Sequence, residues 1–357
     1  MVIQEKEISK DKEAQKLWVP KQVLITPSAL AEPWGQQIMD RITTLGLPVQ
    51  ILKNNRVTGL KGADEKETYR KAKSTLAIVT APPGAFKLQP IPPSADYQFH
   101  LAEGCPAHCQ YCYLAGSLQG PPVTRVFANL PAILNNLKDY RKARPTTYEA
   151  SCYTDPLGIE HLTGSLAETI RFFGEQENME LRWVTKFDGI DGLLNLPHNG
   201  KTQPRISLNT NFITKRLEGG TANLTARLKA IRKLALPKNQ GGGGYKIGLV
   251  IAPIMAVPDW KQQYSGLLDA LEKALDFPCY ITFELITHRF TPGSKALLQA
   301  WYPNTHIDFE EKDRSMKFNK FGGKKFVYNK NTMGLLRSFF ISEIKLRFPD
   351  AKILYWT

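Results

Sequence analysis

Short apolar, β-branched and aromatic runs alternate with segments of helical periodicity along most of the chain. The short runs are typical of buried strands, and apolar residues spaced three or four apart are typical of helices. From residue 97 onward the predicted strands are Tyr97–Leu101, Thr147–Ser151, Leu181–Thr185, Arg205–Leu208, Lys246–Ala252 and Tyr280–Leu285. The predicted helices are Leu130–Tyr140, Ser165–Gly174, Asp188–Leu194, Asn223–Leu236, Trp260–Ala274 and Ser294–Trp301. This alternation predicts an α/β fold whose parallel sheet curls into a partial (β/α)6, TIM-like barrel.

A smaller α/β unit is predicted before the barrel. Its strands are Val23–Ile25, Val49–Leu52 and Thr75–Val79, with a helix over Trp34–Leu45. The proline-rich stretch 81–93 cannot sustain a helix or a central strand, so it predicts a connector. We therefore divide the chain into a flexible leader (1–17), an N-terminal α/β extension (18–95), the partial barrel (96–292) and a C-terminal β-hairpin and helix region (293–357).

Residues 312–330 of the C-terminal region interleave cations with aromatic residues around Gly322-Gly323, which predicts a β-hairpin. Lys and Arg neutralise phosphates and aromatic faces stack on bases, so the hairpin is a candidate nucleic-acid contact. The same pattern also fits a half-buried hairpin with a solvated basic face. The candidate nucleic-acid residues are Lys317, Lys320, Phe321, Lys324 and Lys325, together with Arg289.

Composition indicates a folded chain of enzyme size, because 42% of the 357 residues are hydrophobic and 22% are charged. No apolar run approaches the roughly 18 residues that a membrane-spanning helix needs, and the N-terminus is charged rather than signal-like. We expect a cytoplasmic protein without membrane contact. The net charge of +14 favours a polyanionic partner, although a basic surface without a partner would give the same value.

Three of the five cysteines cluster in Cys105-Pro-Ala-His-Cys109-Gln-Tyr-Cys112, which favours metal binding over disulfides. Three thiolates on a 4Fe-4S cluster leave one iron without a protein ligand, whereas electron-transfer clusters are normally closed by a fourth Cys. An open iron implies a bound substrate or cofactor. A zinc site that uses His108 as a fourth ligand, or thiols that merely pack, are the alternatives.

Polar residues also follow the other predicted strands, where the catalytic residues of barrel enzymes lie. They are Cys152, Thr154, Asp155, Lys186, Asn209, His288 and Arg289. The sequence therefore predicts one functional rim that includes the cysteine loop.

The spacing C-x3-C-x2-C, with an aromatic residue before the last Cys, resembles the signature of the radical S-adenosylmethionine (SAM) enzymes. From about Trp18 to the C-terminus the chain resembles one of their families, the spore photoproduct lyases, which repair DNA without light. The segments that carry the resemblance are Gly104–Leu114, Glu149–Leu162, Val184–Lys186, His198–Thr202, Ser207–Asn209, Ala252–Ile254 and Phe283–Thr291.

The resemblance implies two cofactors, a 4Fe-4S cluster on Cys105, Cys109 and Cys112, and SAM. Tyr111 would pack near the adenine of SAM. Thr154, Lys186, Ser207 and Asn209 match positions that line the SAM pocket, with Thr154 standing where a serine is expected. By the residues alone, Lys186 could equally be a surface ion-pair partner, and Asn209 a strand-end cap.

The resemblance also implies the reaction. A 5′-deoxyadenosyl radical would take hydrogen from C6 of the methylene-bridged thymine dimer, and the bridging C–C bond would break. Cys152 would donate a hydrogen atom to the remaining methyl radical and become a thiyl radical. Tyr113, with Tyr111 near, would then pass it a hydrogen atom and restore the thiol. The alternative for Cys152 is a small buried hydrophobe, which is the interpretation that we favour for Cys279.

Damaged DNA and an electron donor such as flavodoxin or ferredoxin are the implied partners of a monomeric enzyme. The family holds opened DNA at the hairpin, where this chain has Lys320-Phe321 in place of an expected Arg-Tyr pair. That departure bears on the substrate more than on the chemistry. A related enzyme acting on another nucleotide, nucleic acid or metabolite, and a zinc-stabilised nucleic-acid-binding protein without catalysis, are the competing hypotheses.

Overall fold

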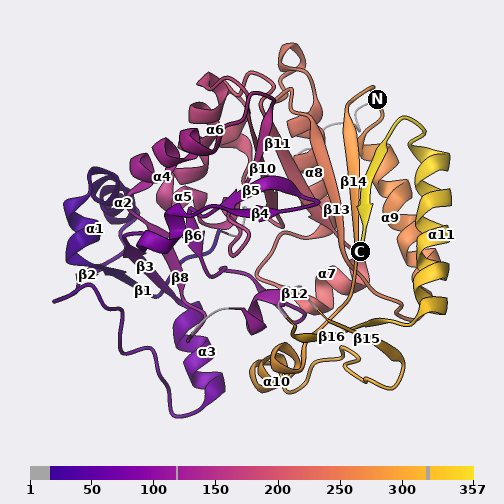
Figure 1. The fold of residues 1–357 in the computed structure, drawn as a ribbon, viewed down its shortest axis with the longest axis horizontal. Coiled ribbons are helices and arrows are strands. Elements are labelled where there is room, and N and C mark those ends of the chain that lie inside the picture. Colours follow the sequence, from indigo (N-terminus) through magenta and orange to yellow (C-terminus); the bar gives the residue numbers. More distant parts are fainter. Residues whose placement is uncertain (1–16, 118–119, 319–321) are drawn as a thin grey trace, which may run out of the picture.

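The computed structural model describes residues 17–117, 120–318 and 322–357. Its central element is a curled sheet in the order β17-β14-β13-β11-β10-β9-β5-β4, in which only β4 runs antiparallel to its neighbour (Figure 1). The strands are β4 (Gln89–Ile91), β5 (Ala95–Phe99), β9 (Thr146–Ala150), β10 (Met179–Thr185), β11 (Thr202–Leu208), β13 (Ile247–Ile254), β14 (Ile281–Thr287) and β17 (Lys352–Trp356). The partial barrel predicted from the sequence is confirmed, and β17 adds a parallel strand that the periodicity did not predict.

Helices cover the outer face of this sheet (Figure 1). They are α4 (Leu130–Asn136), α5 (Glu160–Thr163), α6 (Ser165–Glu175), α7 (Asn211–Leu217), α8 (Leu224–Ala235), α9 (Trp260–Ala274) and α11 (Lys330–Arg347). The helix predicted over Asp188–Leu194 is wrong, because only the 3-10 turn Asp191–Leu193 forms there. Gly189 and Gly192 lower the helix propensity of that segment. No helix in the described part of the chain is long and apolar enough to cross a membrane.

The N-terminal unit is a second sheet in the order β2-β1-β3-β8-β6. Its elements are β1 (Gln22–Ile25), α1 (Pro27–Ala31), α2 (Pro33–Thr44), β2 (Val49–Ile51), α3 (Glu65–Lys73), β3 (Thr75–Val79), β6 (Ala102–Glu103) and β8 (Thr124–Phe127). Strands β6 and β8 lie beyond the boundary predicted at residue 95. The indole of Trp34 also donates to Ser165 Oγ at 3.1 Å, so the extension and the barrel share one core.

The C-terminal region begins with α10 (Pro292–Trp301) and the antiparallel hairpin of β15 (Arg314–Phe318) and β16 (Lys324–Tyr328). Pairing of these strands confirms the predicted hairpin, while residues 319–321, including Lys320 and Phe321, lie outside the described residues. The chain then returns to the barrel through α11 and β17. The short elements are β7 (His108–Cys109), β12 (Glu218–Gly219) and the 3-10 turns Pro83–Phe86, Tyr113–Gly116, Leu137–Tyr140, Leu157–Ile159, Asp191–Leu193 and Lys238–Gln240.

Charged side chains, rather than apolar ones, fill part of the barrel interior. They are Glu149, Arg182, Arg205 and Glu284, each from a different strand and all buried. Glu284 pairs with both arginines, and Glu149 pairs with Arg205. A Cβ on Gly248 would lie 2.6 Å from Cγ of Arg205, so the glycine makes room for this layer. Buried charges are tolerated because each one has a partner.

Substitution of Glu284 tests how strongly this layer depends on charge pairing. Glu284→Gln leaves two buried guanidinium groups short of a negative charge, and we expect unfolding to become easier by roughly 3–5 kcal/mol. Urea unfolding measures the change. Glu168→Gln is the control, since Glu168 pairs with Arg171 at 3.4 Å on the surface and should cost under about 0.5 kcal/mol. Equal midpoints for the two variants would contradict the expectation.

Candidate functional site

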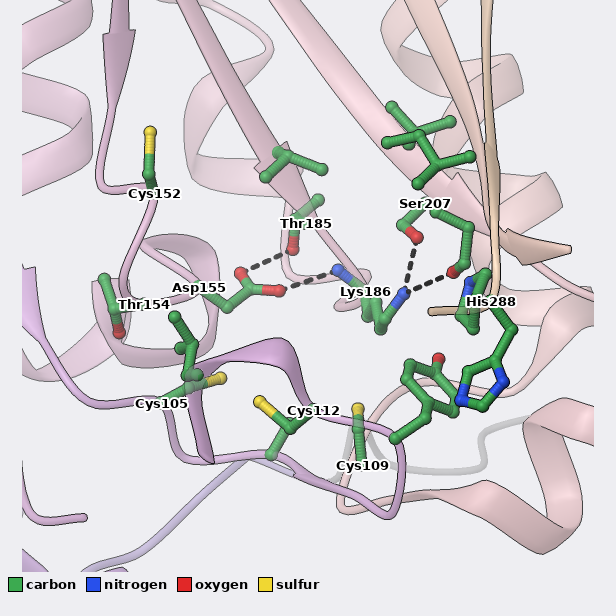
Figure 2. Close-up of a pocket in the computed structure, with 18 of the residues that line it drawn as sticks. Cys105, Cys109, Cys112, Cys152, Thr154, Asp155, Thr185, Lys186, Ser207 and His288 are labelled. Atoms are coloured by element: carbon green, nitrogen blue, oxygen red, sulfur yellow. Dashed lines mark hydrogen bonds between the residues drawn. The ribbon is translucent and has the colours of Figure 1, made fainter. Parts of the chain in front are cut away.

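A cavity of about 350 Å³ lies where the parallel strands of the barrel end. The cysteine loop borders it on one side, and residues at or just beyond the ends of β9, β10, β11, β13 and β14 border it on the other (Figure 2). In barrels of this kind the carboxyl ends of the strands form the catalytic face. The predicted functional rim and the cavity therefore coincide.

The cysteine loop is held at its start and near its middle. Gly104 precedes it with φ at +77°, and a Cβ there would lie 2.1 Å from the carbonyl oxygen of Val123, so only glycine fits. Strand β7 pairs antiparallel with β12, and the amide of Gln110 donates to the carbonyl of Leu217 at 2.9 Å. This fastening directs Cys105, Cys109 and Cys112, all free thiols, to the same side of the cavity (Figure 2).

The donor set fits an iron-sulfur cluster. No three His, Cys, Asp or Glu side chains within the described ranges gather closely enough to hold a single metal ion. A 4Fe-4S cluster does not require such convergence, because each thiolate binds a different iron. His108, the candidate fourth ligand of a zinc site, has Nδ1 2.9 Å from the hydroxyl of Tyr69.

Burial makes the thiolate forms of Cys105 and Cys109 costly in the absence of a metal. It raises the pKa of Cys105 to about 11, although the ammonium of Lys73 acts in the opposite direction, and it also raises the pKa of Cys109. Lys73 is itself buried and donates to the carbonyls of Cys105 and Ala107. Metal binding would therefore release protons from the loop while a fixed cation lies beside it.

The opposite wall of the cavity carries polar groups. Lys186 Nζ donates to Ser207 Oγ at 2.5 Å and to the carbonyl of Ala252 at 3.3 Å (Figure 2). Thr154 also lines the cavity, and its buried Oγ1 has no hydrogen-bond partner among the described residues. An ammonium and an unsatisfied hydroxyl at one cavity suit a polar, carboxylate-bearing ligand.

Asp155 fixes the geometry of this wall. Its carboxylate accepts hydrogen bonds from Thr185 Oγ1 and from the amide of Lys186, both at 2.7 Å (Figure 2). Burial raises the pKa of Asp155 in spite of these bonds. The sequence placed Asp155 on the functional rim, and the structure shows that it holds the backbone from which Lys186 reaches the cavity.

Glu218 is a central residue that the sequence analysis missed. Its buried carboxylate pairs with Arg227 at 2.5 Å and with Lys186 at 3.6 Å, and it accepts a hydrogen bond from the hydroxyl of Tyr111. Burial alone would raise the pKa of Glu218, but Lys186 and Arg227 lower it below the ordinary value. The ring of Tyr111 lies 5.7 Å from Lys186 Nζ. No local motif marks Glu218, because it is separated from Tyr111 by 107 positions.

Cys152 lines the same cavity but lies apart from the other three cysteines, just beyond β9 (Figure 2). The preceding Ser151 has φ at +61°, and its Oγ accepts the amide of Leu101 at 3.0 Å, which fixes the turn. Burial raises the pKa of Cys152 far above its ordinary value, and the hydrogen-bonded carboxylate of Glu149 raises it further. The thiol is therefore protonated at neutral pH. Cys279 packs against the core instead.

Two of the predicted catalytic and cofactor-binding residues, Asn209 and Tyr113, are not seen to line the cavity. The amide of Asn209 donates to the carbonyl of Pro253 at 2.8 Å and accepts from the hydroxyl of Tyr264 at 3.1 Å, and Asn209 is not among the cavity residues. Tyr113 begins the 3-10 turn Tyr113–Gly116, and its side chain lies outside the described part of the structure.

The basic hairpin approaches the cavity through Phe290, which pairs with Phe326 of β16. Arg289, the preceding residue, lines the cavity. Lys317 and Lys325 are cross-strand neighbours, and the pKa of Lys325 is lowered by partial burial and then by Arg289 and Lys317. Cations therefore accumulate beside the cavity opening, while Lys324 lies one position further along the hairpin.

The family model described as spore photoproduct lyase matches residues 18–357. Spore photoproduct lyase of Geobacillus sp. (strain Y412MC61) is 39% identical over 348 residues, which cover 96% of this chain and 100% of that protein. The enzyme of Bacillus subtilis (strain 168) is 38% identical over 349 residues, with the same coverage.

Solved structures of spore photoproduct lyase match the whole fold. The enzyme complexed with dinucleoside spore photoproduct has a TM-score of 0.89 and 37% identity, covering 96% of this chain and 100% of that one. A substituted form with bound AdoMet and the same dinucleoside gives the same values.

The protonation state of Cys152 can be tested by alkylation. A thiol of ordinary pKa is largely thiolate by about pH 9, and only the thiolate reacts. We expect iodoacetamide modification of folded, metal-free protein at Cys152 to keep rising beyond pH 10, without a plateau. The same residue in urea-unfolded protein should approach its plateau near pH 10, as measured by peptide mass spectrometry. Identical pH profiles in the two states would contradict the raised pKa.

Proposed function

The chain belongs to the spore photoproduct lyase family, and from that premise we propose that it repairs the spore photoproduct in DNA by radical SAM chemistry. The observation that carries this proposal is one cavity bordered by three cysteines of a cluster motif and, separately, by a fourth, protonated thiol. Damaged DNA and a one-electron donor protein, such as flavodoxin or ferredoxin, are the partners that this chemistry needs.

Cys105, Cys109 and Cys112 would hold a 4Fe-4S cluster in the cavity, beside the cation of Lys73. With SAM bound and one electron added, the cluster would supply the 5′-deoxyadenosyl radical for hydrogen abstraction from the lesion. The role of the chain is to bind and aim these groups. Deprotonation of the thiols, of which Cys105 and Cys109 have raised pKa values, is the cost of loading the site.

The polar wall of the cavity would bind SAM. Lys186 places an ammonium where a carboxylate can pair with it, and Ser207 and Thr154 offer hydroxyls to polar groups of the ligand. Tyr111, held by Glu218, would pack near the adenine. Asn209 would act from behind this wall, since its amide holds the carbonyl of Pro253, a cavity residue.

Cys152 would return a hydrogen atom to the thymine methyl radical that remains after C–C cleavage. The S–H bond is weaker than the methyl C–H bond that forms, so the transfer runs downhill. A thiolate could not donate a hydrogen atom, and the environment of Cys152 keeps the thiol protonated. Tyr113, with Tyr111 nearby, would then reduce the thiyl radical by hydrogen-atom transfer.

The hairpin and Arg289 would hold the lesion strand at the cavity opening. A lesion inside a duplex must leave the stack to reach a buried site, which costs a few kcal/mol and less for damaged bases. Lys317, Lys325 and Arg289 form a cation cluster whose members repel one another, which favours binding of phosphate between them. Lys320 and Phe321, which lie outside the described residues, remain candidate nucleic-acid contacts from the sequence.

The decisive assay is anaerobic incubation of the reconstituted enzyme with SAM, dithionite and dinucleoside spore photoproduct. We expect conversion of the lesion to two intact thymines.

In the same assay, Cys152→Ala should still cleave SAM but divert most product radicals to by-products, because the hydrogen donor is missing. Chromatography of the nucleoside products measures the partition.

Cys279→Ala is the matched control for the donor role, since it removes a thiol that packs away from the cavity. Its product distribution should equal that of the unsubstituted enzyme. A normal thymine yield from Cys152→Ala would reject the donor role, and absence of repair by the unsubstituted, loaded enzyme would reject the proposed substrate.

Loss of hairpin cations tests the DNA contact. Lys317→Ala/Lys325→Ala should weaken DNA binding and lower the slope of log affinity against log salt by about 2, if each lysine contacts one phosphate. Fluorescence anisotropy over a salt series measures both quantities. Lys229→Ala/Lys273→Ala, on the outer helices α8 and α9, is the control and should match the unsubstituted protein. Unchanged affinity and slope in the hairpin variant would contradict the assignment.

A further inference from the structure

A second cavity, of about 700 Å³, lies on the other side of the cysteine loop, against α3 of the N-terminal extension. Tyr69, Lys73 and Trp301 line this outer cavity, and the same side chains line a smaller cavity that all three loop cysteines border. One layer of side chains therefore separates the outer cavity from the thiols.

That dividing layer is aromatic and tightly joined to the loop. The ring of Tyr69 stacks on Trp301 with centroids 4.7 Å apart, and its hydroxyl lies 2.9 Å from Nδ1 of His108, inside the cysteine loop. Lys73 donates from the same helix to the carbonyls of Cys105 and Ala107. This layer of packed aromatic rings lies between the outer cavity and the loop thiols. Such a layer suits electron transfer, which needs proximity of donor and acceptor but no opening of the protein.

The outer cavity presents cations to solvent. Lys21, Lys66 and Arg70 line it, are exposed and form no salt bridge within the described ranges. Its carboxylates are engaged instead. Asp64 caps α3 by accepting the amide of Glu67 at 2.7 Å, and Glu67 accepts the amide of Ala63 at 2.6 Å and pairs with Lys71 at 3.3 Å. The surface therefore attracts an acidic partner.

We propose that the outer cavity is the docking surface for a small acidic electron carrier of the flavodoxin type, which reduces the cluster through the Tyr69–Trp301 layer. This inference rests on the proposed function, since it assumes a cluster on the three loop cysteines. One electron leaves the flavin hydroquinone anion, which becomes the neutral semiquinone, and lowers the cluster from the 2+ to the 1+ state. No bond forms or breaks, and no proton moves.

Nucleic acid is the competing occupant of a basic surface, and the geometry disfavours it here. Cys152 and Arg289 border the first cavity and not the outer one. A lesion bound at the outer cavity would be separated from Cys152 by the whole cysteine loop. A donor protein at the same place would be next to the group that it reduces.

Charge reversal on α3 tests this surface in the reconstituted holoenzyme. Lys66→Glu/Arg70→Glu should slow cluster reduction by flavodoxin hydroquinone at least tenfold at low ionic strength, as followed by stopped-flow absorbance and by the electron paramagnetic resonance signal of the reduced cluster. Reduction by dithionite, which needs no docking, should be unchanged. The difference between variant and unsubstituted enzyme should shrink as salt is added.

The matched control is Lys229→Glu/Lys273→Glu, which makes the same charge change on α8 and α9, away from α3 (Figure 1). It should keep the rate of the unsubstituted enzyme with flavodoxin. Equal flavodoxin rates in the α3 variant and this control, with equal iron content and melting temperature, would overturn the proposal. A loss of DNA affinity in the α3 variant as large as its loss of flavodoxin rate would overturn it in favour of DNA.

Dithionite-driven repair of dinucleoside spore photoproduct distinguishes a failure of the docking surface from a failure of the proposed function. If the dithionite-driven α3 variant repairs the lesion normally while its flavodoxin-driven reduction fails, both the docking surface and the proposed function stand. If dithionite supports no repair in the unsubstituted enzyme, the proposed function fails irrespective of docking.

Discussion

The site depends on the ion pairs and the hydrogen bond that the buried carboxylate of Glu218 makes. This carboxylate pairs with Arg227 and, at a longer distance, with Lys186, and it accepts a hydrogen bond from the hydroxyl of Tyr111, while the backbone of Glu218 pairs with that of Cys109. Without this charge, the fully buried guanidinium of Arg227 would lose its carboxylate partner, at a cost of several kcal/mol, and Lys186 at the cavity would lose its ion pair. Glu218 therefore contacts both the cysteine loop, through Tyr111 and Cys109, and the polar wall, through Lys186.

The interior of the barrel is arranged in two polar levels with different charge balance. In the lower level, Glu149, Arg182, Arg205 and Glu284 pair among themselves, so the net charge is zero and the layer acts as filling. In the upper level, Lys186 is shared with Glu218 and Thr154 has an unsatisfied hydroxyl, which leaves capacity for a ligand. Glu149 also joins the levels, because it hydrogen-bonds the thiol of Cys152.

Local patterns allowed the strands and the cysteine motif to be predicted, because both are properties of a few consecutive residues. Strand β17 was missed because it joins the barrel after a hairpin and a long helix, where the alternation had faded. Glu218 could not be found, since Tyr111 and Lys186, the two site residues that it contacts, are distant from it in sequence. Asn209 follows a strand as predicted, yet the neighbouring Tyr264 hydroxyl and Pro253 carbonyl occupy its amide, which strand position alone does not reveal.

The N-terminal extension has a chemical role that its sequence did not indicate. Its α3 brings Lys73 and Tyr69 into contact with the cysteine loop, so the loop lies between two separate surfaces. One surface faces the barrel cavity with Cys152, and the other faces solvent across a single aromatic layer. In the proposed reaction, a radical generated in the barrel would need shielding from water and reductant, whereas a cluster on the loop would need access to an electron donor. Placing the loop as a partition between the two surfaces meets both requirements, because an electron can pass through packed side chains that exclude solvent.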